Sequence, residues 1–347
     1  MTTLAPGMTE RFLSLVESGL PRPAIDLALE LTAGGFPLDR LILDVLGPTQ
    51  QQVGHLWQSN RWSVAQEHAA TAVVDGVLGA VALQTPPRHS GQGSVLVACV
   101  EGEYHSLAAR LGAELLRYDG WDVAFLGASL PASDLRSFAV IAAPDVVVLS
   151  CTVPEFLLGG GRCIAALAEI GVPAVAAGAG FGTTGDRAAR LGASGWIGQG
   201  MSATAVIKGS LTPAGPPKGR DAEAVQLELA AEEVAVAALA ELFSRTPALS
   251  SNPDLQERIR TDLATIVAYL GLALDLEEPQ LFAGFVSWLA DVQSSRKLPP
   301  ALVSDSLDVV AGLTERRGLS RAAQICSAAR AGTETPVVEL VDPPDGA

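Results

Sequence analysis

The spacing of apolar residues changes twice along the chain and divides it into three parts. It is helical over residues 8–84, alternates between short apolar runs and helical segments over 94–207, and is helical again over 221–330. Two stretches rich in proline, glycine and polar residues, 85–93 and 208–219, separate these parts and are typical of linkers. We therefore expect three domains.

The first part predicts a bundle of four short helices. The pair Gly47-Pro48 is expected to end one helix and to begin the next, because proline is tolerated in the first turn of a helix. Ser63, with Gln66 three residues later, resembles a capping box. A helix is therefore predicted to begin there and to run through Leu83.

The second part predicts a parallel sheet with helices on both faces, because its apolar runs are short and are separated by helical segments. The expected strands are Val95–Val100, Val123–Leu126, Asp145–Ser150, Pro173–Ala177 and Gly195–Ile197. The expected helices lie near 106–118, 133–142, 157–170 and 184–191. Ligands of such sheets bind at the carboxyl ends of the strands, so the loops after the strands are where we look for chemistry.

Composition narrows the classes of protein that remain. Hydrophobic residues make up 48% of the 347 residues, which excludes a largely disordered chain. The formal net charge of −15 argues against a duplex-DNA binder, so we expect no nucleic-acid partner. The sequence contains neither a secretory signal nor a run of 18 uncharged apolar residues, and the four widely separated cysteines favour buried thiols in a reducing cytoplasm. The acidic, proline-rich tail over 331–347 is expected to be mobile.

The loop after the first strand holds the first candidate site. Glu103 and His105 are two residues apart, so in an extended loop they can point to one side. A carboxylate that accepts the proton of one imidazole nitrogen leaves the other nitrogen free to bind a metal. His105 is the one histidine of this part, so a metal here would need its other ligands from elsewhere, such as a macrocycle. The alternative is a polar loop histidine in contact with solvent.

The ends of two further expected strands carry small and hydroxyl-bearing residues. Ser150 and Thr152 end the third strand, and Gly178, Gly180 and Phe181 follow the fourth. Such residues leave a slot between the sheet and the following helices, in which the long tail of a ligand fits. The alternative for the glycines is an ordinary tight turn from strand to helix.

Together these residues resemble the cobalamin-binding Rossmann-like, or flavodoxin-like, domain of methionine synthase, the mutases and their relatives. That family has Asp or Glu, any residue, His, two residues and Gly, then Ser-x-Leu or Ser-x-Thr, then Gly-Gly. Glu103, His105, Ser150 and Thr152 match, whereas Ala108 and Ala177 replace glycines. The resemblance implies that His105 is the lower axial ligand of cobalt, that Ser106 and Leu107 lie beside the cofactor, and that the nucleotide tail fills the slot.

The first part carries a more specific resemblance. Trp57, nine residues and then Glu67-His68 is typical of the helical cap that holds 5′-deoxyadenosylcobalamin in light-responsive transcriptional repressors. The resemblance implies that Trp57 packs on the adenosyl group, that Glu67 hydrogen-bonds it and that His68 lies nearby. Those repressors have a DNA-binding domain before the bundle, whereas this chain starts almost directly with the bundle.

The position after the tryptophan departs from that family. The repressors place a histidine there, which binds cobalt after photolysis, whereas this chain has Gln58. His55 lies one turn earlier on the same helical face and is a possible substitute. A buried, hydrogen-bonded role for His55 is the alternative.

The third part contains no catalytic motif, and its simplest interpretation is a structural or dimerisation bundle. A photosensor of this kind with an added helical domain resembles photocobilins, in which that domain binds biliverdin noncovalently. A bilin needs aromatic walls and cations for its propionates. The candidate residues are Tyr269, Phe282, Phe285 and Trp288 for the walls, and Arg258, Arg260, Arg296 and Arg317 for the propionates.

The sequence therefore predicts a photoreceptor that binds adenosylcobalamin, with biliverdin as a second chromophore, and that catalyses no turnover. Light is expected to remove the adenosyl group and to change cap packing and the homo-oligomeric state or the contacts with a downstream protein. A corrinoid shuttle protein for methyl transfer uses the same two-domain module and is the alternative. A scaffold that binds nothing is the third interpretation.

Overall fold

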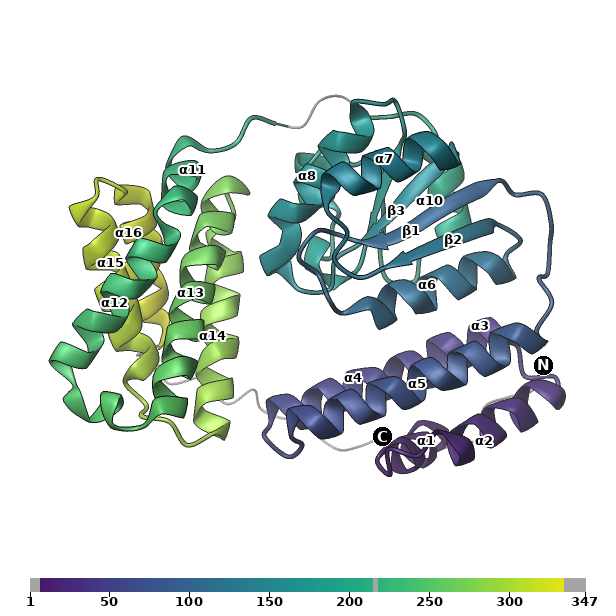
Figure 1. Cartoon of the computed structure of the whole chain (residues 1–347), viewed down its shortest axis with the longest axis horizontal. Coiled ribbons are helices and arrows are strands. Elements are labelled where there is room, and N and C mark those ends of the chain that lie inside the picture. The colour runs from purple at the N-terminus through teal and green to yellow at the C-terminus, as the bar shows by residue number, and fades with distance from the viewer. Residues whose placement is uncertain (1–6, 215–217, 334–347) are drawn as a thin grey trace, which may run out of the picture. The chain divides into compact units, whose positions relative to one another are not determined.

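The chain folds into two compact units, residues 1–219 and 220–347 (Figure 1). The structure is a computed structural model that describes residues 7–214 and 218–333. Most of the tail expected to be mobile, residues 334–347, lies outside the described residues.

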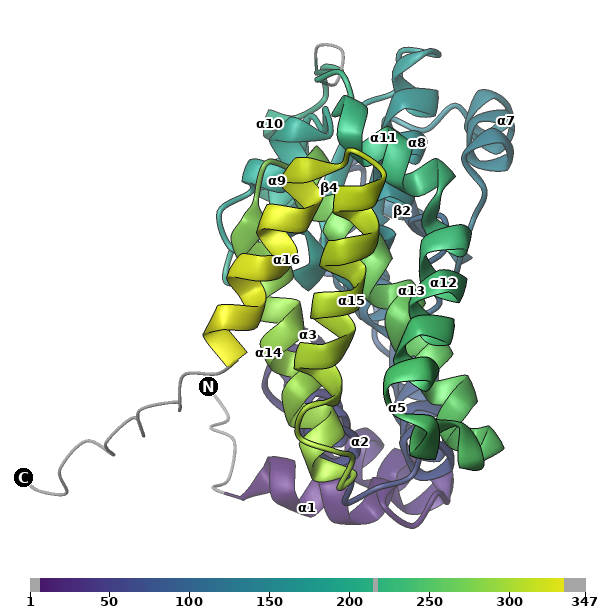
Figure 2. The ribbon, with the colours of Figure 1, turned by 90° about the vertical axis from the view of Figure 1, so that its left-hand side faces the viewer.

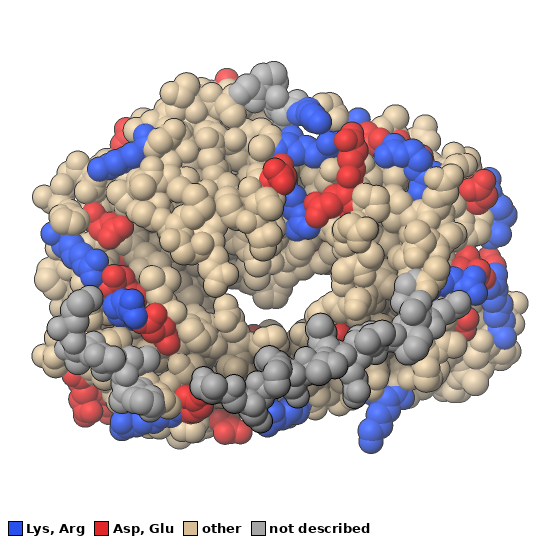
Figure 3. Space-filling model, turned by 180° about the vertical axis from the view of Figure 1, so that it is seen from behind, with Lys and Arg blue, Asp and Glu red and all other residues tan. Residues whose placement is uncertain are grey.

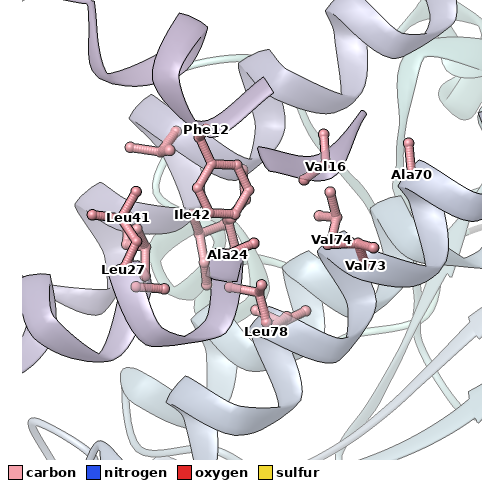
Figure 4. Close-up of a cluster of buried hydrophobic side chains, with 14 of the residues drawn as sticks. Phe12, Val16, Ala24, Leu27, Leu41, Ile42, Ala70, Val73, Val74 and Leu78 are labelled. Atoms are coloured by element: carbon pink, nitrogen blue, oxygen red, sulfur yellow. The ribbon is translucent and has the colours of Figure 1, made fainter. Parts of the chain in front are cut away.

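The first unit begins with a helical bundle. Its elements are α1 (Met8–Val16), α2 (Pro21–Ala33), α3 (Leu38–Leu41), α4 (Gly47–Gln58) and α5 (Val64–Gln84). Phe12, Leu41 and Leu78 are among the side chains that fill the bundle core (Figure 4). The expected capping box is confirmed, because the Ser63 hydroxyl accepts the Gln66 N–H and the Gln66 side chain accepts the Ser63 N–H. This box sets the first turn of α5.

The expected break at Gly47-Pro48 is wrong, because the helix continues from Leu38 to Gln58 through a π-helical stretch, Ile42–Leu46. Proline normally leaves the carbonyl four residues earlier without a partner. Here that carbonyl belongs to Asp44, and the Thr9 hydroxyl of α1 donates a hydrogen bond to it at 3.3 Å. The π turn and this contact between helices let the proline stand inside the helix.

A five-stranded parallel sheet follows, as the sequence predicts. The strands are β1 (Ser94–Cys99), β2 (Asp122–Gly127), β3 (Val146–Ser150), β4 (Ala174–Ala177) and β5 (Gly195–Ile197), in the order β2-β1-β3-β4-β5. This order is the flavodoxin-like one, and it confirms the expected fold class. The helices that alternate with the strands are α6 (Ser106–Tyr118), α7 (Ala132–Ala142), α8 (Leu157–Ala168), α9 (Asp186–Arg190) and α10 (Ala203–Gly209).

Helix α6 joins the sheet to the bundle because it is apolar on two sides. Ala109, Ala113 and Leu116 pack with the strands in the core of the sheet domain. Leu107 belongs instead to the buried cluster of the bundle, and Leu111, Leu115 and Tyr118 pack against that cluster. The first unit therefore contains both of the first two expected domains.

The second unit consists of helices in its described part (Figure 2). They are α11 (Ala222–Leu229), α12 (Ala231–Arg245), α13 (Pro253–Asp275), α14 (Pro279–Ser295), α15 (Leu302–Arg316) and α16 (Ser320–Thr333), with a 3-10 turn at Pro247–Ser251. The middle of this unit is α13, whose stretch from Ile266 to Asp275 is almost wholly buried.

Charged side chains are mixed on the face shown in Figure 3, where lysine and arginine lie beside aspartate and glutamate. Among the described residues on that face, the basic side chains form no continuous patch. Within the ranges 7–214 and 218–333, no helix is both long enough and apolar enough to cross a membrane.

Candidate functional site

The buried carboxylate of Glu103 holds the loops of the candidate site together. Its side chain is fully buried in the loop between β1 and α6. One carboxylate oxygen, Oε1, accepts hydrogen bonds from the backbone N–H of His105 at 2.8 Å and from its Nδ1 at 2.6 Å. The other, Oε2, accepts the backbone N–H groups of Thr152 at 2.8 Å and Val153 at 2.9 Å. The carboxylate thus ties the loop after β1 to the loop after β3.

These hydrogen bonds set the charges of the pair. Burial acts to raise the pKa of Glu103, but the donors from His105, Val153 and Thr152 outweigh it and lower that pKa. The hydrogen bond that His105 donates to Glu103 raises the pKa of His105, against the opposing effect of burial. The pair therefore favours an ionised carboxylate and a proton on Nδ1.

The imidazole of His105 is held at one nitrogen and open at the other. It lies at the N-terminal end of α6, and its side chain is 62% exposed. Because Nδ1 is bound to Glu103, the lone pair of Nε2 is the available metal donor, and Nε2 has no partner among the described residues. No group of three or more metal-ligating side chains exists in the described part of the chain. A metal at His105 would thus carry its other ligands with it.

The residues expected to hold the ligand's tail lie at the ends of β3 and β4. Ser150 is buried and follows the alternation of Val146 and Val148, which face the core formed with α6 and α10. The hydroxyl oxygen of Thr152 is buried without a hydrogen-bond partner. A buried hydroxyl in this condition is unusual in a native protein and points to a bound group that supplies the missing partner.

The loop after β4 approaches the end of β3 very closely. Gly178 has a φ of +98°, and a side chain there would overlap the carbonyl of Cys151. At Gly180 a Cβ atom would lie 2.8 Å from the Cys151 Sγ. Phe181 is fully buried and lies close to Gly160 of α8. The glycines therefore let the chain after β4 pack directly against the end of β3.

The bundle contributes a hydrogen-bonded chain of side chains at the start of α5. Gln50 Nε2 donates to the Thr71 hydroxyl at 2.7 Å, and Thr71 donates to Glu67 Oε1 at 2.8 Å. The other oxygen, Glu67 Oε2, lies 2.5 Å from His68 Nδ1. Both oxygens of Glu67 are thus held in place.

Residues of the bundle and of the sheet domain interact electrostatically at the candidate site. The negative charge of Glu67 also raises the pKa of His105, as a smaller effect than the hydrogen bond that His105 donates to Glu103. Ser106 begins α6 directly after the histidine, and Leu107 points into the bundle core. On α4, Trp57 and Gln58 are half-buried, whereas His55 is exposed.

Three polar residues of this region were not predicted from the sequence. Gln50 and Thr71 carry no motif, and only the packing of α4 on α5 brings them to Glu67. Glu155 follows β3, and burial, together with the charge of Glu103, raises its pKa. Its place after the Ser150-x-Thr152 motif was the one available signal.

In the second unit, the expected aromatic residues form one continuous group. The rings of Tyr269 and Phe285 are stacked, with centroids 3.9 Å apart, and Phe282 and Trp288 lie 6.5 and 6.1 Å from Phe285. The first three side chains are buried in the core, whereas Trp288 is 37% exposed.

The four expected arginines do not gather at one place. The charges of Arg258 and Arg296 act on the half-buried Asp262, whose carboxylate accepts a hydrogen bond from Gln293 at 2.9 Å. Arg260 instead pairs with Glu257 on the surface. The guanidinium of Arg317 lies 4.0 Å from Glu233.

Residues 93–208 match the family model described as the B12 binding domain. Residues 8–82 match a second model with the same description. These two matches support cobalamin binding by the first unit, and the first of them covers Glu103, His105 and the ends of β3 and β4.

Two curated proteins from Myxococcus xanthus are similar to parts of the chain. HTH-type transcriptional repressor CarH is 32% identical over 130 residues, which cover 37% of this chain and 42% of that protein. HTH-type transcriptional repressor CarA is 37% identical over 90 residues, which cover 26% of this chain and 31% of that protein. The chain thus matches less than half the length of either relative.

Among solved structures, the Methanosarcina barkeri monomethylamine corrinoid protein is similar, with a TM-score of 0.49 and 17% identity. The superposition covers 55% of this chain and 92% of that protein.

The residues present fit a corrinoid. His105 offers one open nitrogen, and the buried hydroxyl of Thr152 lacks a partner among the described residues. A macrocycle that brings its own equatorial ligands needs only one protein donor, which is what this site provides.

Proposed function

We propose that the chain is a light sensor that binds adenosylcobalamin between its helical bundle and its parallel sheet. One observation carries the proposal most directly. The Glu103–His105 pair presents an open Nε2, and the charge of Glu67, from the Trp57 to Glu67-His68 motif, acts on that same histidine. A lower ligand and a cap typical of the light-responsive family therefore lie in one compact unit.

Different residues of the chain hold different parts of the cofactor. Glu103 keeps the proton on Nδ1 of His105, so that Nε2 would be the nitrogen that holds cobalt. Ser150, Thr152 and Gly178 receive the nucleotide tail at the edge of the sheet. Trp57 and Glu67 face the adenosyl group, with Thr71 and Gln50 holding the Glu67 carboxylate in place.

Adenosylcobalamin, when bound, supplies absorption of visible light and a weak cobalt–carbon bond that light breaks. Loss of the adenosyl group would remove the contact of the cap residues, and the bundle would then repack against α6. We propose that this repacking changes the homo-oligomeric state or the contacts with a downstream protein, without catalytic turnover. The similarity to parts of CarH and CarA, both described as transcriptional repressors, supports a regulatory role.

The proposal is tested by absorption spectra of the full chain loaded with adenosylcobalamin in the dark, recorded before and after green light. We expect a light-dependent spectral change and a shift in elution volume on size-exclusion chromatography. His105→Ala should bind the cofactor more weakly and without histidine ligation, whereas the matched variant His89→Ala, in the linker, should behave as the wild type. A spectrum unaffected by light would contradict the proposal.

The corrinoid shuttle remains the competing function, because a Glu-His pair of this kind serves it equally well. Accumulation of methylcobalamin with a methyl donor and its methyltransferase, together with no response of the adenosyl form to light, would favour it.

We further propose biliverdin as a second chromophore in the second unit. The stacked Tyr269 and Phe285, with the exposed edge of Trp288, support an aromatic wall, and Arg258 and Arg296 lie near each other as cations. Co-expression with a source of biliverdin should then add red absorbance to the protein. If only corrin bands appear, the unit is structural.

A further inference from the structure

Ser129 has a backbone conformation that its place in the fold does not explain. It lies in the loop between β2 and α7, and its φ is +45°. Among the described residues, the other non-glycine residues with a positive φ are Asn60, Ala143, Glu277 and Lys297. Each of these follows the C-terminal end of a helix, where a left-handed residue commonly ends the helix. Ser129 follows a strand instead.

Two hydrogen bonds hold Ser129 to the loop after β1. Its backbone N–H donates to the carbonyl of Glu103 at 2.8 Å, and its hydroxyl accepts the backbone N–H of Gly102 at 3.2 Å. Strands β1 and β2 are parallel neighbours, so their loops leave the same edge of the sheet. A strained backbone persists where its surroundings over-determine it, and such residues cluster at functional sites. The two bonds therefore point to a role for Ser129 in the candidate site.

The two bonds hold the backbone on both sides of the Glu103 side chain. One fixes the peptide group that precedes Gly102, and the other fixes the peptide group that follows Glu103. Gly102 is also confined by the ring of Phe156, which would lie 2.9 Å from a Cβ atom at that position. The direction in which the Glu103 side chain leaves the backbone is thus set from outside its own loop.

The Glu103 carboxylate passes this constraint on to the imidazole. It accepts the N–H groups of His105, Thr152 and Val153 at distances between 2.6 and 2.9 Å. Hydrogen bonds weaken steeply as their angles depart from linear, so a rotation of the Glu103 backbone would release some of these donors. His105 would then lose the acceptor that keeps its proton on Nδ1.

We propose that Ser129 is a positioning residue for the metal donor, because it holds the backbone of Glu103 and thereby keeps Nε2 of His105 available to cobalt. It acts through Glu103 and His105 rather than on the cofactor. Glycine would adopt the left-handed conformation freely, but it has no hydroxyl to accept the Gly102 N–H. The inference rests on the proposed cobalamin site and names a residue that supports its metal donor.

The first test uses the full chain without cofactor and with ¹⁵N-labelled histidine, at a pH where histidine is neutral. Long-range ¹H–¹⁵N NMR spectra distinguish a protonated imidazole nitrogen from a bare one. We expect His105 to carry its proton on Nδ1 in the wild type and to show a mixture of tautomers in Ser129→Ala. Ser129→Asn should restore the wild-type spectrum, because asparagine tolerates a positive φ and offers an amide oxygen to Gly102.

The second test measures cobalt ligation in the full chain loaded with cob(II)alamin. An axial nitrogen splits the cobalt lines of the electron paramagnetic resonance spectrum, and ¹⁵N-histidine changes the splitting only if that nitrogen belongs to a histidine. The isotope effect should be present in the wild type and in Ser129→Asn, and reduced in Ser129→Ala. Cobalamin binding by Ser129→Ala should weaken about tenfold, as is common for residues that orient a metal ligand.

Two glycine variants separate positioning from stability. Ala143→Gly relaxes a backbone of almost the same φ, +46°, at the opposite end of α7. It should raise the urea midpoint and leave histidine ligation unchanged. Ser129→Gly should lose histidine ligation although its urea midpoint stays close to that of the wild type, since relief of strain offsets the lost hydrogen bond. Circular dichroism should confirm that all variants are folded.

Wild-type tautomer and ligation in Ser129→Ala, or equal losses in Ser129→Ala and Ser129→Asn, would overturn the inference. If the wild type binds no cobalamin, the proposed function fails, and the tautomer measurement still decides whether Ser129 positions the imidazole. If the wild type binds cobalamin through His105 and Ser129→Ala matches it in both tests, only the role of Ser129 is wrong.

Discussion

The carboxylate of Glu103 accepts four hydrogen bonds, and all four of its donors are N–H groups. An amide has only one oxygen to offer, so Glu103→Gln turns an NH₂ group toward two of these donors. The variant should unfold about 1–3 kcal/mol more easily than the wild type, because buried donors are left without acceptors. Urea unfolding of the cofactor-free protein measures the difference.

Glu169→Gln is the matched control for this substitution. Glu169 is 60% exposed and pairs with Arg136 on the surface, so its loss should change stability by less than about 0.5 kcal/mol. Equal losses in the two variants would show that Glu103 does not hold the loops together.

Glu155 makes the stability of the protein depend on pH. Burial, and then the charge of Glu103, raises the pKa of Glu155 above its ordinary value of 4.5. The folded protein thus holds this proton more tightly than the unfolded chain, and stability falls as the pH rises from about 4.5 through the folded-state pKa. Glu155→Gln should therefore be more stable than the wild type at pH 7.

The difference in stability between Glu155→Gln and the wild type should disappear as the pH is lowered toward 4.5, the ordinary pKa of a glutamate. Urea midpoints at a series of pH values measure it. A constant gap across the range would mean that titration of Glu155 is not its cause.

At the scale of elements, the capping box at Ser63 sets where α5 begins and therefore where Glu67 and His68 stand. Ser63→Ala removes the acceptor for the Gln66 N–H and should lower the free energy of unfolding by about 1 kcal/mol. It should also weaken adenosylcobalamin binding, since the first turn of α5 frays. Thermal unfolding and a binding titration measure the two effects.

A serine-to-alanine substitution inside a helix should not lower the free energy of unfolding. Ser14 is an exposed residue within α1, and alanine has the higher helix propensity, so Ser14→Ala should leave stability unchanged or raise it by a few tenths of a kcal/mol. A loss of stability in Ser14→Ala as large as that in Ser63→Ala would contradict a capping role.

Local signals were sufficient to predict most elements of the sheet domain. The strand runs are short, apolar and separated by helical spacing, and each was found within two residues of its expected ends. The Gly47-Pro48 site was mispredicted because its outcome depends on Thr9, a residue far away in the chain. A proline breaks a helix unless something else satisfies the released carbonyl, and local sequence does not reveal such a partner.

The candidate site was predictable to the same degree. Glu103 and His105 are neighbours in sequence, so their spacing alone predicted a contact that the structure contains. Thr71, Gln50 and Glu155 acquire their roles from packing and burial, which no spacing records. The side of α6 on which Leu107 lies depends on the bundle that covers it.

At the scale of the molecule, Arg88 connects the parts of the first unit. From the linker it donates to Asp39 of α3 at 2.6 Å, and its guanidinium lies 4.4 Å from the centre of the Tyr118 ring at the end of α6. Arg88→Ala should lower the free energy of unfolding by about 1 kcal/mol. It should also speed hydrogen exchange in α3 relative to the sheet. Exchange measured by mass spectrometry reports both regions at once.

Arg22→Ala removes a comparable guanidinium from an exposed pair with Asp26 within one helix. It should leave the exchange of α3 unchanged. If both variants loosen α3 equally, Arg88 does not hold the bundle to the sheet domain.

The link from His105 through Glu103 to the backbone of Thr152 and Val153 also has a mechanical consequence. A movement of the imidazole that keeps its hydrogen bond to Glu103 would pull on the chain after β3, where the ring of Phe156 leaves no room for a side chain at Gly102. A displacement of His105 would therefore be transmitted to the half-buried turn Pro154–Phe156. The signal of a fluorine label on Phe156 would therefore report changes in the position of His105.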